Sequence, residues 1–156
     1  MMKKLLVLLF ALALVFTFAA CGNGDNGADE YENGDVYENG AAANSAVADF
    51  LAEHGDEIRG MTDAMTGAMG ADGRVELEAG SGNELVYRFI YGSEFDFDVE
   101  GMGDMLAETL STMGSFFEML AETFRDELEL EYMRITVRYY DHAENLIASE
   151  SFDSAQ

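Results

Sequence analysis

Two stretches of helical periodicity, each followed by a pair of strand-like segments, constrain the fold of this chain most strongly. Apolar residues recur at spacings of three and four over residues 47–65 and again over residues 98–126, which predicts two amphipathic helices. Strands are predicted at 74–79 and 85–91 after the first helix, and at 130–140 and 146–152 after the second. Polar turns at 80–83 and 141–145 separate the strands of each pair. The predicted order is therefore α-β-β-α-β-β.

The apolar stripes of these helices need a partner, and the sheet is the only large surface that the chain offers. We therefore expect an α+β fold in which a four-stranded antiparallel sheet carries two helices on one face. Alternate strand residues should point toward the helices. This inward set is Val75, Leu77, Leu85, Tyr87, Phe89, Tyr91, Met133, Ile135, Val137 and Tyr139.

The pattern of the N-terminal region predicts an export signal. Lys3 and Lys4 precede an uncharged apolar run over residues 5–20. This run is short for a bilayer span, which needs roughly 20 apolar residues. A short positive segment followed by such a run is typical of a cleaved secretory signal peptide. We therefore expect three parts: a signal peptide (1–20), a tether (21–45) and a single α+β domain (46–156).

The residues at the end of the apolar run, Thr17-Phe18-Ala19-Ala20-Cys21, resemble the lipobox of bacterial lipoproteins. This resemblance implies that the sulfur of Cys21 receives a diacylglyceryl group and that the chain is cut just before it. Phe18 stands where leucine is commoner. The alternatives are an ordinary signal peptide with a stray cysteine, or an uncleaved helix. Because Cys21 is the only cysteine, no intramolecular disulfide is possible.

The expected tether is acidic and poor in apolar residues. Residues 22–45 hold six acidic residues and no basic one. Such a segment buries too little apolar surface to offset its ordering entropy, so we expect disorder. Its charge should keep the domain away from an anionic bilayer. A role in collecting divalent cations is the alternative, although the spacing of the carboxylates matches no defined loop.

The charge of the mature chain excludes two classes of partner. After removal of residues 1–20, six arginines face 31 acidic residues, which gives a net charge of −25. Nucleic-acid binding needs a basic footprint, and adsorption to anionic lipid uses polybasic segments. The acidity favours solubility through self-repulsion, and a saline or alkaline habitat is a sharper hypothesis. We expect the chain to contact the lipid bilayer through acylated Cys21, and an envelope protein or an anionic or sugar ligand is a possible further partner.

The domain resembles a family of small, uncharacterised Gram-positive lipoproteins called domain of unknown function 4854. The resemblance covers the lipobox, the acidic tether and roughly residues 46–152. It rests on the helix, the segment 75–87 (VELEAGSGNELVY), the long second helix and the closing hairpin. It implies no functional residues.

The best candidate for a site is the outward side of the sheet. Arg88, Arg134 and Arg138 should point outward beside Tyr132 and Tyr140. Guanidinium groups and aromatic faces suit an anionic or sugar ligand. The alternative is pairing across strands with acidic residues of the same sheet. Those acidic residues would be Glu76, Glu78 and Glu150.

The sequence offers weaker evidence for other candidate sites. Residues 96–104 resemble the start of a calcium-binding loop, but Ala107 stands where a bidentate glutamate is needed. A helix N-terminus capped by Asp98 is the preferred interpretation. We expect His54 in the core or at its boundary and His142 exposed in a turn. No metal, cofactor or catalytic residue is predicted.

These observations favour a lipid-anchored domain on the outer face of the cytoplasmic membrane that binds an envelope protein or an anionic or sugar ligand without catalysis. A structural or inhibitory envelope module is the alternative. A cell-wall-acting hydrolase is a weaker alternative, because no catalytic motif is present in the sequence.

Overall fold

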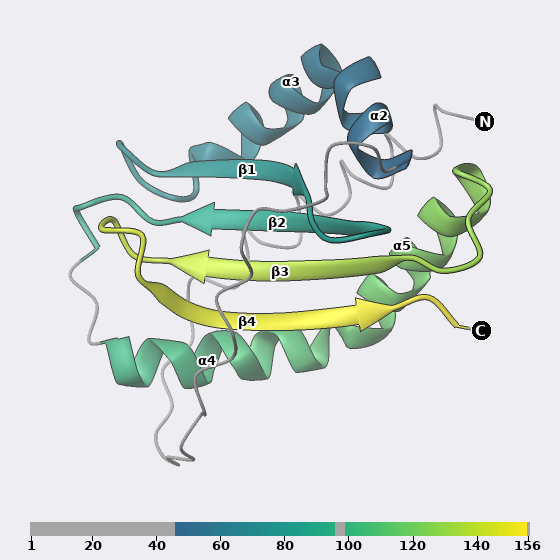
Figure 1. The fold of residues 1–156 in the computed structure, drawn as a ribbon. Coiled ribbons are helices and arrows are strands. Elements are labelled where there is room, and N and C mark those ends of the chain that lie inside the picture. Colours follow the sequence, from purple (N-terminus) through teal and green to yellow (C-terminus); the bar gives the residue numbers. More distant parts are fainter. Residues whose placement is uncertain (1–45, 96–98, 156) are drawn as a thin grey trace.

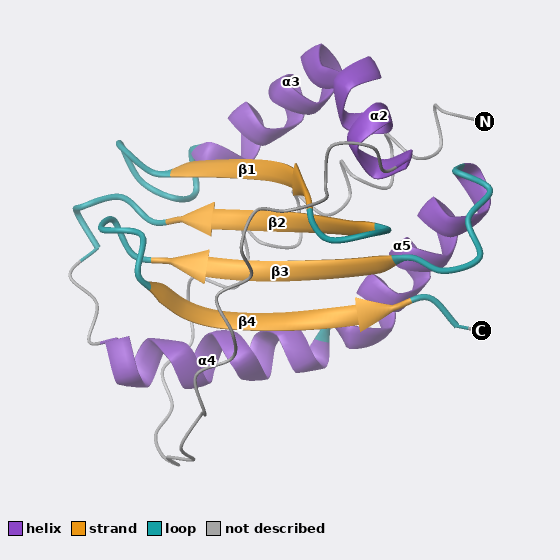
Figure 2. Ribbon diagram, in the orientation of Figure 1, coloured by secondary structure: helices purple, strands orange, loops and turns teal. Residues whose placement is uncertain are grey.

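The computed structural model describes residues 46–95 and 99–155 (Figure 1). It shows an α+β domain with four helices and one four-stranded sheet (Figure 2). The first half contains α2 (Ala46–Glu53), α3 (Gly55–Thr66), β1 (Arg74–Ala79) and β2 (Glu84–Ile90). The second half contains α4 (Val99–Thr112), α5 (Gly114–Glu127), β3 (Arg134–Tyr140) and β4 (Leu146–Asp153).

Each predicted helix is broken into two. The first breaks at His54, immediately before Gly55, and the second at Met113, immediately before Gly114. Glycine weakens a helix because it loses more backbone entropy than other residues on folding. The apolar stripe continues past each break, and for this reason the periodicity alone did not reveal it.

The prediction of a fully antiparallel sheet is wrong. The strand order is β1-β2-β3-β4, and both hairpins are antiparallel, but the central strands β2 and β3 run parallel. The reason is the helical crossover between them. Helices α4 and α5 carry the chain back along the sheet, so β3 starts at the end where β2 started (Figure 1).

One hydrophobic core joins the helices to the inner face of the sheet, which we define as the face carrying Leu85, Tyr87, Phe89, Ile135, Val137 and Tyr139. Helices α2 and α3 contact β1, α4 contacts β4, and α5 contacts β4 and β3. Buried residues of all four helices belong to the same cluster as the inner-face residues. The predicted inward residues are therefore confirmed, with Leu77 and Tyr91 only partly buried at its margin.

Aromatic rings connect the second helical pair to the rest of the core. The rings of Phe117 on α5 and Phe152 on β4 stack with their centroids 4.7 Å apart. The rings of Phe124 on α5 and Phe50 on α2 meet edge to face at 5.6 Å. Such pairs contribute beyond the area that they bury, and here they bind α5 to both the sheet and the first helical pair.

Candidate functional site

The outer face of the sheet, opposite the helices, collects the predicted site residues. Alternation along the strands places Arg88, Arg134, Arg138 and Tyr140 on this face, and Arg88 and Arg138 are register partners on the parallel central strands. The apolar stripes of the described helices pack on the other, inner face. The sequence therefore predicted the orientation of these side chains correctly, despite the wrong direction of β3 relative to β2.

Arg88 lies within an ion-pair network at the β1 side of the outer face. Its Nη1 donates to Glu76 Oε2 at 2.7 Å and its Nη2 donates to Glu144 Oε2 at 3.1 Å. Its Nε lies 3.9 Å from Glu78 Oε1. The guanidinium carbon also lies 4.9 Å from the centroid of the Tyr140 ring, a cation–π distance. The predicted pairing with Glu76 and Glu78 is confirmed.

Glu144 was not among the predicted partners. It lies in the β3–β4 turn with a positive φ of 62°, and it also accepts a hydrogen bond from Arg74 Nη2. Hydrogen bonds from Arg74, and to a lesser extent from Arg88, hold the pKa of Glu144 below its usual value. Strand alternation does not apply to a turn residue, so no sequence pattern indicated that this carboxylate reaches the sheet.

Arg134 forms a fork-like pair at the opposite end of the face. Its Nε and Nη2 donate to the two carboxylate oxygens of Asp153, at 2.7 Å and 3.2 Å. Tyr132 donates a hydrogen bond to the same carboxylate, and its ring centroid lies 5.8 Å from the guanidinium carbon. The bond from Arg134 lowers the pKa of Asp153. Asp153 is the register partner of Arg134 but lies one residue beyond the predicted strand end.

Between the two arginine groups lies a small hydrogen-bond network of two hydroxyls and one carboxylate. Thr136 donates from Oγ1 to Glu84 Oε1 at 2.5 Å, and its hydroxyl lies 2.8 Å from that of Ser151. Thr136 is almost fully buried although it belongs to the outer face. The polar groups around it are therefore satisfied within the sheet.

Arg138 differs from the other arginines. Among the described residues it has no ion pair and no hydrogen-bond partner, although it is only partly exposed. The five other arginines each pair with a carboxylate. These pairs are Arg59–Asp56, Arg74–Glu76, Arg88–Glu76, Arg125–Asp126 and Arg134–Asp153. The structure thus assigns carboxylates to two of the three candidate arginines and leaves Arg138 without one.

The predicted pairing through Glu150 is wrong. Glu150 lies opposite Val137 and alternates with Ala148 and Phe152, so its side chain belongs to the inner face. It is half-buried beside the helices, and burial raises its pKa. The segment 146–152 lacks a clear alternation, so its sequence did not settle which residues point inward.

We expect Glu150→Gln to raise the melting temperature at neutral pH. A carboxyl whose folded pKa is raised destabilises the folded state once it is ionised, and this cost is absent below its ordinary pKa of 4.5. The gain should therefore be present at pH 7 and vanish as the pH falls below that value. Thermal melts of both forms from pH 4 to pH 8 measure it. A variant less stable than the wild type at pH 7 would contradict the assignment.

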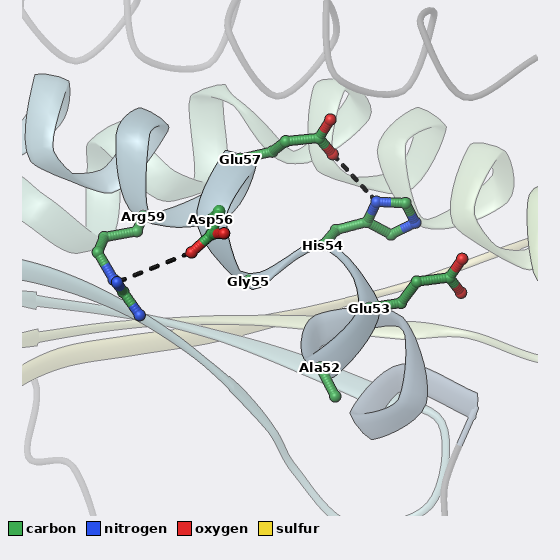
Figure 3. A pocket seen from close by; sticks show the side chains of 7 residues that line it. All are labelled: Ala52, Glu53, His54, Gly55, Asp56, Glu57 and Arg59. Atoms are coloured by element: carbon green, nitrogen blue, oxygen red, sulfur yellow. Dashed lines mark hydrogen bonds and ion pairs between the residues drawn. The ribbon is translucent and has the colours of Figure 1, made fainter.

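A second polar region lies at the α2–α3 break. Residues 52–57 and Arg59 line an open hollow of about 510 Å³. His54 Nδ1 lies 3.0 Å from Glu57 Oε2, while Arg59 and Asp56 form a separate, exposed pair at 3.9 Å. Figure 3 shows the two pairs on either side of Gly55, so their groups do not converge on one point.

Both histidine predictions are confirmed. The His54 side chain is 11% exposed, and its ring centroid lies 4.8 Å from that of Phe50, which is a boundary position. His142 is exposed in the β3–β4 turn. The two histidines belong to different parts of the fold, one at a helix break and one in a strand turn.

Several predictions fall outside residues 46–95 and 99–155. These are the signal peptide, Cys21, the tether and the proposed cap Asp98. Within the described ranges, no group of three or more His, Cys, Asp or Glu residues could hold a metal ion. None of the helices in these ranges combines the length and the apolar character needed to cross a membrane.

The geometry defines a small α+β domain whose mixed sheet has a helix-covered inner face and a charged outer face. A family model described as Domain of unknown function (DUF4854) matches residues 47–152, and the chain belongs to this family. Neither the curated proteins nor the solved structures contain a match to the chain.

Proposed function

We propose that this chain is a lipid-anchored, extracytoplasmic lipoprotein of a Gram-positive cell envelope, and that its domain binds a protein or ligand without catalysing a reaction. The anchor rests on the lipobox-like segment before Cys21 and on the acidic residues that follow it. Two acyl chains, at roughly 0.8 kcal/mol per buried CH2, hold a protein at a membrane stably. The domain then faces outward from the cytoplasmic membrane, on a tether that repels anionic lipid.

The observation that carries the binding proposal is the outer face of the sheet. Its strands present arginine and tyrosine side chains in fixed register, while the helices occupy the inner face. This face concentrates four of the six described arginines of an acidic protein: Arg74, Arg88, Arg134 and Arg138. Arginine and tyrosine are enriched at binding interfaces.

Site-specific photo-crosslinking in living cells tests this proposal. A photoreactive residue in place of exposed Ser151, on the outer face, should give an adduct with a partner. The same residue in place of exposed Ser111, on α4, serves as the matched control and should give none. The adduct should disappear in an Arg134→Gln/Arg138→Gln background and persist with Arg59→Gln, which removes an exposed arginine from α3.

The outcomes separate the candidate functions. An adduct at Ser151 with no turnover supports a binding module, and an adduct only from Ser111 overturns the role of the outer face. Turnover of a cell-wall fragment by the purified mature protein would favour the hydrolase alternative. An adduct that forms equally in the double variant would favour a structural module that packs through its backbone and apolar atoms rather than its arginines.

A further inference from the structure

We propose that Arg138 and Ser149 form a subsite for the oxyanion group, carboxylate or phosphate, of the ligand that the outer face binds. The inference deepens the proposed function and rests on it. It selects Arg138 from the five candidate residues and adds Ser149, which the sequence analysis did not single out. Arg138 on β3 and Ser149 on β4 are register partners, so their side chains stand next to each other on the outer face.

Both side chains keep unused hydrogen-bond donors. Arg138 and the exposed Ser149 hydroxyl have no hydrogen-bond partner among the described residues. A guanidinium offers five N–H donors and the hydroxyl offers one more. Arg88 stands on the other side of Arg138 as its register partner on β2, and its own charge is directed at Glu76 and Glu144. Arg138 is therefore the guanidinium on this face that remains available to an added anion.

The missing partner is unusual for this composition. Residues 46–156 contain 25 acidic and six basic residues, a net charge of −19. Carboxylates are in large excess, and every other described arginine forms an ion pair with one. A guanidinium that stays unpaired at the centre of the sheet, with serine rather than an acidic residue opposite it on β4, is suited to an anion from outside.

The net charge also limits the class of ligand. A polyanion would be repelled by the rest of the domain, whereas a single oxyanion group on a neutral molecule gains the Arg138 contact with little repulsion. The Tyr140 ring adds an aromatic surface beside the arginines on the same face. We therefore expect a neutral ligand body bearing one carboxylate or phosphate group.

Titration followed by NMR tests the subsite in the full mature chain. Resonances of the arginine Nε–Hε groups are recorded while inorganic phosphate, acetate or chloride is added at matched ionic strength. We expect a saturable shift of the Arg138 resonance with phosphate or acetate, and none at Arg59, which has its own carboxylate. The anion that saturates the shift at the lowest concentration is the preferred oxyanion.

Variants supply the second readout. Arg138→Gln and Ser149→Ala should each weaken anion binding, with the arginine change costing about tenfold or more, as expected for a charge-assisted hydrogen bond. Neither should lower the melting temperature, because neither side chain has a hydrogen-bond or ion-pair partner within residues 46–95 and 99–155. Arg138→Lys should restore only part of the affinity, since an ammonium lacks the planar fork.

Three results would overturn the subsite. They are no shift at Arg138 with either oxyanion, equal shifts at all arginines or with chloride, and unchanged affinity in Arg138→Gln. The failure of the subsite is distinguishable from that of the proposed function. If the Ser151 adduct survives Arg138→Gln and is lost in Arg134→Gln, the outer face binds a partner but Arg138 is not its anchor.

Discussion

Replacing Phe117 with alanine is expected to lower the free energy of unfolding by about 3–5 kcal/mol, the range measured for removal of a buried aromatic ring. Phe117 has no exposed surface, and its ring stacks on Phe152 of β4 at 4.7 Å. It lies in the first turn of α5, directly after the break at Met113. The substitution would leave a cavity at the junction of crossover helix and sheet, where the surroundings can collapse only partly.

Such a loss is a large fraction of the roughly 5–15 kcal/mol that stabilises a domain. Denaturant titration of the mature protein, followed by circular dichroism, measures it. The neighbouring Phe116→Ala is the matched control, because Phe116 is only partly buried and should cost less. A loss below about 1 kcal/mol for Phe117→Ala would show that this ring does not hold α5 on β4.

Replacing Cys21 with serine is expected to abolish the lipid anchor. On the lipoprotein proposal the thiol of Cys21 receives the diacylglyceryl group, and a serine hydroxyl cannot replace it, so no acyl chain should enter the bilayer. The acidic segment 22–45 gives no attraction to anionic lipid that could replace the anchor. If the variant is cleaved, cell fractionation should find it in the medium rather than in the membrane pellet. If it is not cleaved, it should stay with the membrane as a heavier precursor that keeps the apolar run 5–20 and carries no lipid.

Intact-mass measurement gives the decisive readout. The wild-type membrane form should begin at Cys21 and carry the added mass of the lipid, whereas the variant should carry none. Ser45→Ala, at the far end of the expected tether, is the control and should leave both mass addition and location unchanged. A wild-type chain that begins at another residue, or that carries an unmodified Cys21, would refute the lipoprotein proposal.

Local patterns predicted the strands well because strand position and facing depend on neighbouring residues. The alternation of Val75 with Glu76 and of Tyr87 with Arg88 identified both the strand and its inner side. The helix breaks at His54 and Met113 escaped the same reasoning. A stripe of apolar residues continues across a one-residue break, and only the backbone dihedral angles of the break residue reveal it.

The sequence predicted the face of the sheet to which the candidate arginines point, but not the carboxylates with which they pair. Strand side chains alternate between the two faces of the sheet, and this alternation along β2 and β3 placed Arg88, Arg134 and Arg138 on one face. Their partners depend on contacts across strands and from turns, and Glu144 reaches Arg88 from 56 residues away in the sequence. Glu150 was predicted on the wrong face for the same reason, because its neighbours in β4 did not fix the register.

The sequence by itself determined the order of helical and strand regions and the residues of the core, since both follow from local periodicity. Its composition determined the acidic character, which argues against nucleic-acid binding. Tertiary structure alone decided that β2 and β3 run parallel, because that depends on where the crossover helices return the chain. It also decided which arginine has no ion pair with the part of the chain that the structure describes. Whether an arginine meets a carboxylate is set by the register of the assembled sheet, and for Arg138 the register places Ser149 opposite.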